Sequence, residues 1–178
     1  AYEILIGLVG SEMCIRDLPG AERSPAVSPN GKLLAISYEE SRPLAFTPDR
    51  IATVDLSTKD VGILTESVDG DAANILWRAD GKALYFAFDE RGERHIKQVT
   101  LNKAVSPVAT GLGGTSVGRP YLSGGFHTAG GVVAYTKGGP DRPADIAVTQ
   151  RRTPKIITAL NDDPVSYTHL RAHETNQD

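Results

Sequence analysis

The sequence has only one cysteine, Cys14, among its 178 residues. A single cysteine excludes an intrachain disulfide framework and a cysteine-rich zinc site. The sequence also has no large excess of charge of either sign, because 19 basic and 22 acidic residues leave a formal net charge of −3. We therefore expect neither nucleic acid nor a membrane surface as a partner. No apolar run is long enough to cross a bilayer, and no stretch keeps a sustained helical period.

What the sequence does contain is glycine and proline, 18 and 11 residues respectively, in an otherwise ordinary globular composition with 40% hydrophobic residues. This length suits a single domain, and so many turn-forming residues favour many short strands.

The two ends of the chain match each other as DNA. Residues 4–17 and 165–178 can be encoded by one segment and its reverse complement, so that GAC for Asp17 becomes GTC for Val165. Such a match over 14 consecutive residues is not expected by chance, and both ends resemble translated transposase adapters from shotgun sequencing libraries. We expect 1–17 and 165–178 to be non-native and exclude them from the fold. The alternative is a genuine N-terminal strand and C-terminal tail.

The protein's own sequence is then 18–164, in which basic and acidic residues are equal in number. Cys14, Met13, His169 and His173 all fall in the excluded ends. We expect 18–164 to be an internal fragment of a longer protein, and it indicates neither a redox compartment nor a targeting signal.

The remaining sequence repeats. Ala26–Ile36 aligns with Leu76–Phe86 at an offset of 50, each with an apolar strand, Asn-Gly or Asp-Gly, a lysine and a second apolar strand. These dipeptides supply the positive φ that a tight hairpin needs. A weaker third copy places strands at 120–122 and 132–135, joined by a turn over 123–131.

The second half of each repeat also recurs, with a third strand at 51–56, 96–101 and 144–149 and a fourth at 61–65, 106–110 and 155–158. The sequence therefore predicts an all-β, partial β-propeller of about three four-stranded antiparallel blades, at 24–66, 72–111 and 117–161. Three blades do not close a ring, so we expect open blade faces and marginal stability for the isolated fragment.

Gly114-Thr-Ser-Val-Gly118 fits the G-x-S-x-G pattern, in which a strand-to-helix turn exposes a nucleophilic serine. Here Arg119-Pro120 leads into a strand, so we interpret 110–118 as an inter-blade loop. His95, after a charged turn, and His127, in a glycine-rich turn, have no nucleophile and acid indicated nearby. Two histidines so far apart make a weak zinc site.

Asp69, Asp71 and Asn74 offer oxygen ligands, but the further acidic positions of an EF-hand loop are absent. Gly31-Lys32 and Gly81-Lys82 lack the serine or threonine of a phosphate loop. Trp77 is expected to anchor blade packing. The sequence thus predicts no catalytic, cofactor-binding or metal-binding residue and no cofactor.

Ser24–Ile36 and Trp77–Phe86 resemble the S-P-D-G-K repeat of bacterial WD-repeat-like propellers. Val132–Val148, with the phrase Ile157-Thr-Ala-Leu-Asn161, resembles the last propeller blade of the prolyl oligopeptidase family, in particular its bacterial acylaminoacyl-peptidase-like members. In that family the propeller is not catalytic. It caps an α/β-hydrolase domain and admits short peptides to a Ser-Asp-His triad.

The resemblance implies that this chain is a piece of a substrate-gating propeller and is itself inactive. Its partners would be the hydrolase domain, expected after Pro164, the remaining blades of the same polypeptide, and peptide substrates of the parent. Tol-system periplasmic propellers carry the same repeats without a hydrolase, which leaves a protein-binding scaffold as the rival. The Pro-Asp-Arg-Pro-Ala segment at 140–144 favours the peptidase. A lyase or glycosidase site within the propeller lacks convergent acids or metal ligands.

Overall fold

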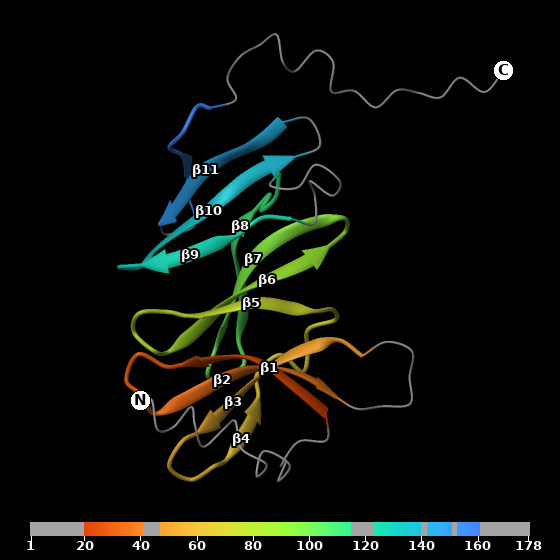
Figure 1. Cartoon of the computed structure of the whole chain (residues 1–178), viewed down its shortest axis with the longest axis vertical. Helices are drawn as coiled ribbons and strands as arrows, with labels where there is room; N and C mark the ends of the chain where they lie inside the picture. The colour runs from red at the N-terminus through yellow and green to blue at the C-terminus, as the bar shows by residue number, and fades with distance from the viewer. Residues whose placement is uncertain (1–19, 41–46, 115–122, 140–141, 151–152, 161–178) are drawn as a thin grey trace, which may run out of the picture.

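The computed structural model describes residues 20–40, 47–114, 123–139, 142–150 and 153–160, which hold twelve β-strands and no helix (Figure 1). The strands form three antiparallel sheets of four, each following chain order. Sheet 1 comprises β1 (Gly20–Val27), β2 (Leu33–Glu40), β3 (Asp49–Asp55) and β4 (Val61–Ile63). Sheet 2 comprises β5 (Ala72–Trp77), β6 (Ala83–Glu90), β7 (Glu93–Thr100) and β8 (Val105–Thr110). Sheet 3 comprises β9 (Phe126–Ala129), β10 (Val132–Gly139), β11 (Arg142–Gln150) and β12 (Thr153–Ile156).

The predicted all-β fold with three four-stranded units is therefore confirmed. The sheets are stacked face to face, and the first strands β1, β5 and β9 contact one another in succession (Figure 1). No membrane-spanning helix is found in the part of the chain that the structure describes.

The first two hairpins turn as their dipeptides predict. Gly31 and Gly81 adopt φ of 70° and 67°, which a residue with a Cβ rarely adopts. In each turn the side chain before the glycine accepts a hydrogen bond from the following lysine N–H, at 3.0 Å for both Asn30 and Asp80. The same local chemistry thus starts β2 and β6 at equivalent places.

The third hairpin differs from the prediction. Residues 126–129, predicted to be part of a turn, form β9, which pairs directly with β10 from Ala129↔Val132 to Phe126↔Tyr135. Gly130 and Gly131 take φ of 56° and 79° and close a two-residue hairpin. The prediction of a long turn was wrong because Gly130 and Gly131 form the tight turn here, at the place where the first two hairpins have Asn-Gly and Asp-Gly. The strand predicted at 120–122 lies outside the described residues.

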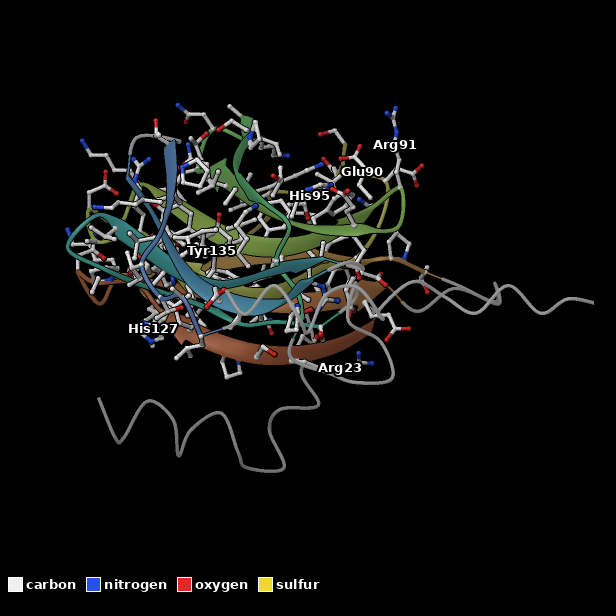
Figure 2. All side chains as sticks on the ribbon, turned by 90° about the horizontal axis from the view of Figure 1, so that it is seen from above. Arg23, Glu90, Arg91, His95, His127 and Tyr135 are labelled. Carbon is white, nitrogen blue, oxygen red and sulfur yellow. The ribbon has the colours of Figure 1, made fainter. Side chains whose placement is uncertain are left out.

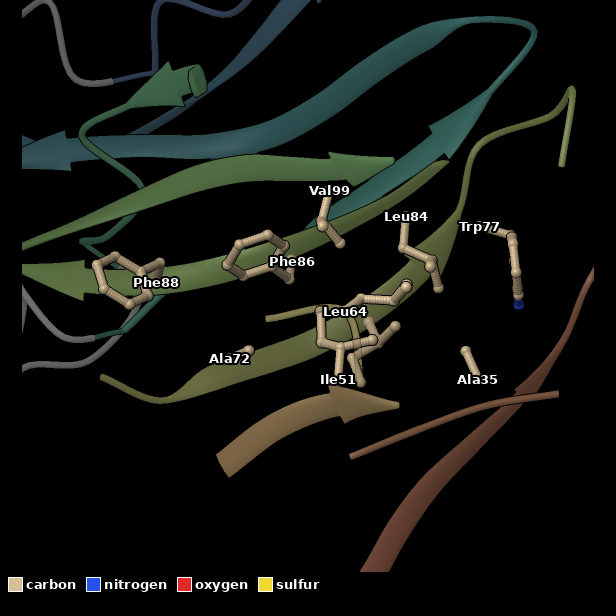
Figure 3. Close-up of a cluster of buried hydrophobic side chains, with 10 residues drawn as sticks. Ala35, Ile51, Leu64, Ala72, Trp77, Leu84, Phe86, Phe88 and Val99 are labelled. Carbon is tan, nitrogen blue, oxygen red and sulfur yellow. The ribbon is translucent and has the colours of Figure 1, made fainter. Parts of the chain in front are cut away.

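Two apolar junctions hold the sheets together. Junction 1/2 packs the sheet 1 side chains Ala35, Ile51 and Leu64 against sheet 2 (Figure 3). The sheet 2 side chains of this junction are Ala72, Ile75, Trp77, Leu84, Phe86, Phe88 and Val99. Trp77 also donates from its indole N–H to the carbonyl of Ala26 on β1, at 2.8 Å. The predicted packing role of Trp77 is confirmed, and the hydrogen bond ties two first strands across the junction.

Junction 2/3 lies on the other face of sheet 2. Its sheet 2 members are Tyr85, Ala87, Ile96, Ala109 and the following Leu112, and its sheet 3 members are Val133, Tyr135 and Ala147. Sheet 2 is therefore covered on both faces, which explains why the six residues from Ala83 to Phe88 are all buried.

The two outer sheets differ in what covers them. On sheet 1 the face turned away from sheet 2 holds a third buried cluster of Leu34, Ile36, Tyr38 and Ala52. On sheet 3 the face turned away from sheet 2 is open. Ile51, Ile96 and Ile146 occupy equivalent third-strand positions, and the first two are 0% exposed whereas Ile146 is 36% exposed.

Candidate functional site

The G-x-S-x-G segment gives its first glycine a packing role. Gly114 has φ of 79°, and a Cβ there would lie 2.8 Å from the Cβ of Ala144. Only glycine allows the chain leaving sheet 2 to approach β11 so closely. Ser116 and Gly118 lie outside the described residues.

The two candidate histidines lie on different sheets (Figure 2). His95 is on β7, next to the β6–β7 hairpin, where Arg94 pairs with Asp89 and Lys97 with Glu90. The hydrogen bond from Lys97 holds the pKa of the Glu90 carboxyl below its usual value. The predicted charged hairpin is therefore present. His127 is exposed on β9, so its assignment to a turn was wrong.

The oxygen-bearing segment at 69–74 serves the fold. Asp71 accepts a hydrogen bond from the Asp49 N–H at 2.9 Å, which links the starts of β3 and β5. Asn74 is exposed at φ of 52° in a β-bulge of β5, and Ser24 is at φ of 53° in the matching bulge of β1. Among the described residues no group of three or more acidic, histidine or cysteine side chains is arranged to hold a metal ion.

In all three sheets a polar residue immediately precedes the equivalent isoleucine of the third strand. These residues are Arg50, His95 and Asp145. Arg50 donates to the carbonyl oxygens of Thr65, Glu66 and Val68, at 2.6, 3.0 and 3.0 Å. Its counterpart Asp145, 1% exposed, accepts hydrogen bonds from the Thr158 hydroxyl at 2.9 Å and the Leu160 N–H at 3.0 Å. Both side chains therefore fasten the segment that leaves the fourth strand.

In sheets 1 and 3 an equivalent threonine also binds the third strand. Thr65 and Thr158 each accept a hydrogen bond at 2.8 Å from the N–H of the equivalent isoleucine, Ile51 or Ile146. In sheet 2 the counterpart of Arg50 and Asp145 is His95, whose buried Nδ1 has no hydrogen-bond partner among the described residues. His95 was a candidate from the sequence, but its equivalence to Arg50 and Asp145 was missed, although a threonine near the end of every fourth strand was visible as a signal.

A pocket of about 200 Å³ opens at junction 2/3. Sheet 2 contributes Tyr85, Gln98, Pro107 and Val108, and sheet 3 contributes Gly131, Val133 and Thr149. Thr149 is 3% exposed, and its hydroxyl oxygen is buried with no hydrogen-bond partner among the described residues. No sequence motif indicated this pocket.

The pocket wall carries no formal charge, since none of its seven lining residues is ionised at neutral pH. Burial raises the pKa of the Tyr85 phenol above its usual value, so Tyr85 stays neutral. Gln98 donates to the Ser106 hydroxyl at 3.0 Å and accepts a long hydrogen bond from Arg78 at 3.4 Å. Arg78 in turn binds Asp80 through two hydrogen bonds of 2.8 and 2.7 Å, which holds the pKa of Asp80 at about 2.

No protein-family model matches the sequence, and no curated protein does. Several solved structures match the fold. TolB from Acinetobacter baumannii aligns with a TM-score of 0.57 and 19% identity over 79% of this chain and 33% of its own. A nidogen/laminin complex aligns at 0.55 and 12%, over 82% and 50%. The acylaminoacyl peptidase of Pyrococcus horikoshii aligns at 0.51 and 13%, over 78% and 25%.

These likenesses, with the three stacked antiparallel sheets, define the chain as a partial β-propeller whose sheets are blades. The chain spans half or less of the length of the structures it matches. Its structural neighbours include both TolB and an acylaminoacyl peptidase. Identities of 12–19% establish the fold alone.

Proposed function

We propose that this chain is part of the substrate-gating propeller of a serine peptidase of the prolyl oligopeptidase family. The catalytic hydrolase domain would follow residue 164, and residues 1–17 and 165–178 would be adapter-derived. The resemblance of 132–148 and 157–161 to the last blade of such propellers motivates the proposal. The fold is compatible with it, since an acylaminoacyl peptidase aligns over 78% of the chain.

The observation that carries the proposal is the end of sheet 3. Asp145 fixes the Ile157–Leu160 phrase through Thr158 and the Leu160 N–H. Ile157, 54% exposed, occupies the position that the buried Leu64 has in sheet 1, where the next blade covers it. The side chain that needs a different cover is Leu160, which is 81% exposed, and a large apolar side chain exposed to water favours a covering surface. In the proposed parent that surface is the hydrolase domain.

The role of the blades is then exclusion, not chemistry. A ring of blades over a hydrolase site leaves only a narrow path, which flexible peptides pass and folded proteins do not. No residue of this chain is assigned to the triad. The 178-residue chain is therefore expected to leave acylated peptide amides uncleaved, and Ser116→Ala is expected to change nothing.

The experiment begins with DNA from the source sample, amplified across the codon for Pro164 and read onward in frame. A strand-helix G-x-S-x-G followed by an aspartate and a histidine is the expected result. The recovered protein should then hydrolyse short acyl-peptides, and Leu160→Glu should lower its thermal stability by several degrees. Leu101→Glu, at an exposed leucine of the β7–β8 turn, is the matched control. A reading frame that continues with the adapter-like sequence in genomic DNA would contradict the proposal.

A second candidate is a protein-binding scaffold of the Tol type. A TolB structure and a putative TolB structure align with the chain at TM-scores of 0.57 and 0.52. The Asn/Asp-Gly-Lys hairpins of this chain also resemble the repeats of Tol-system propellers. If the reading frame beyond 164 adds only further hairpins of this kind and then stops, the scaffold is favoured over the peptidase. Removal of Leu160 should then leave partner binding unchanged.

A further inference from the structure

The pocket at junction 2/3 exists because sheet 3 fills its junction less than sheet 2 fills the equivalent one. Strand register pairs Leu84 with Val99 and with Trp77 in sheet 2. The same register in sheet 3 pairs Val133 with Thr149 and with Thr128. Each sheet 3 residue is therefore smaller or more polar than its sheet 2 counterpart.

The opposite wall is also more polar. Tyr85 and Gln98 of sheet 2 stand where sheet 1 has Ala35 and Thr53. The pocket is thus lined by a tyrosine, a glutamine and a threonine, together with apolar surface from Pro107, Val108 and Val133.

The hydroxyl of Thr149 is the unusual member. Its counterpart Val99 is a residue of the same shape that is 0% exposed in junction 1/2. Valine would leave no polar atom without a partner, whereas the buried Thr149 oxygen has none in the described part of the chain. A buried hydroxyl without a partner destabilises the folded state, so its presence beside a pocket favours a ligand that satisfies it.

Size and charge define the ligand. A cavity of about 150 Å³ holds benzene, so 200 Å³ suits one substituted six-membered ring. The neighbouring cation, Arg78, is already neutralised by Asp80, and no charge lines the wall. An anionic ligand would therefore lose its hydration without gaining an ion pair.

We propose that the pocket between sheets 2 and 3 binds a neutral, hydroxylated six-membered ring of monosaccharide size. Val133 and Pro107 pack against the apolar face of the ring. Tyr85, Gln98 and Thr149 exchange hydrogen bonds with its hydroxyl groups. This site is independent of whether the blades belong to a peptidase or to a scaffold.

Saturation-transfer-difference NMR on the full 178-residue chain tests the site, with glucose, cyclohexanol and glucose 6-phosphate as probes. Glucose should give the strongest transfer, with millimolar affinity, and glucose 6-phosphate should give none. Thr149→Val keeps the shape and should weaken glucose binding about tenfold, since one buried hydrogen bond is worth roughly that factor. Val133→Leu, which copies Leu84, should abolish binding.

The matched control is Thr53→Val, the same change in sheet 1 and outside the pocket, which should leave the glucose signal intact. The melting temperature is the second readout. Thr149→Val should melt at or above the parent temperature, because it removes a hydroxyl without a partner. The proposal is overturned if no neutral ring binds the unaltered chain, if glucose 6-phosphate binds as well as glucose, or if Val133→Leu keeps the glucose signal. Stronger binding of cyclohexanol than of glucose would also overturn it, since hydroxyl recognition would then be absent.

Discussion

The two junctions between blades are built on one repeat and differ in what they contain. Junction 1/2 has Trp77, Leu84 and Val99 at the corresponding positions, and all three side chains are buried. Junction 2/3 has Thr128, Val133 and Thr149 instead, and a pocket of about 200 Å³. The backbone registers match, so the difference lies in side-chain volume and polarity. A repeat can therefore hold blades together at one junction and open a site at the next without a change of fold.

The largest expected loss of stability comes from replacing Trp77 of junction 1/2 by threonine, the residue type at the equivalent position 128 of junction 2/3. Trp77→Thr removes a buried indole and its 2.8 Å hydrogen bond to Ala26. We expect a loss of about 3–5 kcal/mol in the free energy of unfolding, a large share of the stability of a domain. Urea denaturation followed by circular dichroism measures it. Thr128→Ala, the equivalent position in sheet 3, should cost less than about 1 kcal/mol. Equal losses in the two variants would show that the junctions do not differ.

The equivalent isoleucines give the next largest effect. Ile96→Ala empties a position that is 0% exposed and should cost about 2–5 kcal/mol. Ile146→Ala changes a side chain that is 36% exposed and should cost less than about 1 kcal/mol in this chain. Urea midpoints of the two variants provide the measurement. In a longer parent with a further blade over sheet 3, the cost at Ile146 should rise toward that at Ile96, and an unchanged cost would argue against such a blade.

A smaller effect is expected at Tyr135, which takes the place in junction 2/3 that Phe86 takes in junction 1/2. Burial raises the pKa of the Tyr135 phenol, and its hydroxyl has no hydrogen-bond partner among the described residues. Tyr135→Phe should therefore be neutral or stabilise the chain by up to about 1 kcal/mol. Differential scanning calorimetry measures this change, and a clear fall in the melting temperature would mean that the hydroxyl is satisfied in solution.

The smallest expected effect is a pH dependence of stability that the Asp80-Gly81 turn has and the Asn30-Gly31 turn lacks. Asp80 has a folded-state pKa of about 2, lowered from 3.8 by hydrogen bonds from Arg78 and the Lys82 N–H. Its stabilisation is present above pH 3.8 and is lost as the pH falls from 3.8 through 2. Solvent screening limits it to less than about 1 kcal/mol, because the carboxylate is 45% exposed. Asp80→Asn, which copies the Asn30 turn, should flatten stability over that pH interval in urea titrations, and an unchanged slope would assign the acid sensitivity to other groups.

The parts of the fold that depend on local chemistry could be predicted from the sequence. Asn30-Gly31 and Asp80-Gly81 determine two hairpins by their backbone preferences, and the offset of 50 residues located the strands on either side. Strand β9 was missed because Phe126–Ala129 lies between two pairs of glycines, at 124–125 and 130–131, which resemble a single long turn.

The sites depend on distant contacts and could not be predicted in the same way. The partners of Arg50 are backbone carbonyl groups about 15 residues along the chain. Every residue has such a carbonyl group, so the residue types do not reveal which ones Arg50 binds. The pocket is a matter of missing volume, which becomes visible only when Thr128, Val133 and Thr149 are aligned with their counterparts by strand register.

The recurrence of an isoleucine at 51, 96 and 146 has an evolutionary consequence. Each sheet offers its successor the same apolar position, and two of the three are already occupied by the next sheet. A gene duplication that copies one unit of 45–50 residues therefore produces a blade whose two faces fit its neighbours from the outset. Propellers with different blade numbers can arise by this route, because ring size can change while the contact between adjacent units is inherited unchanged.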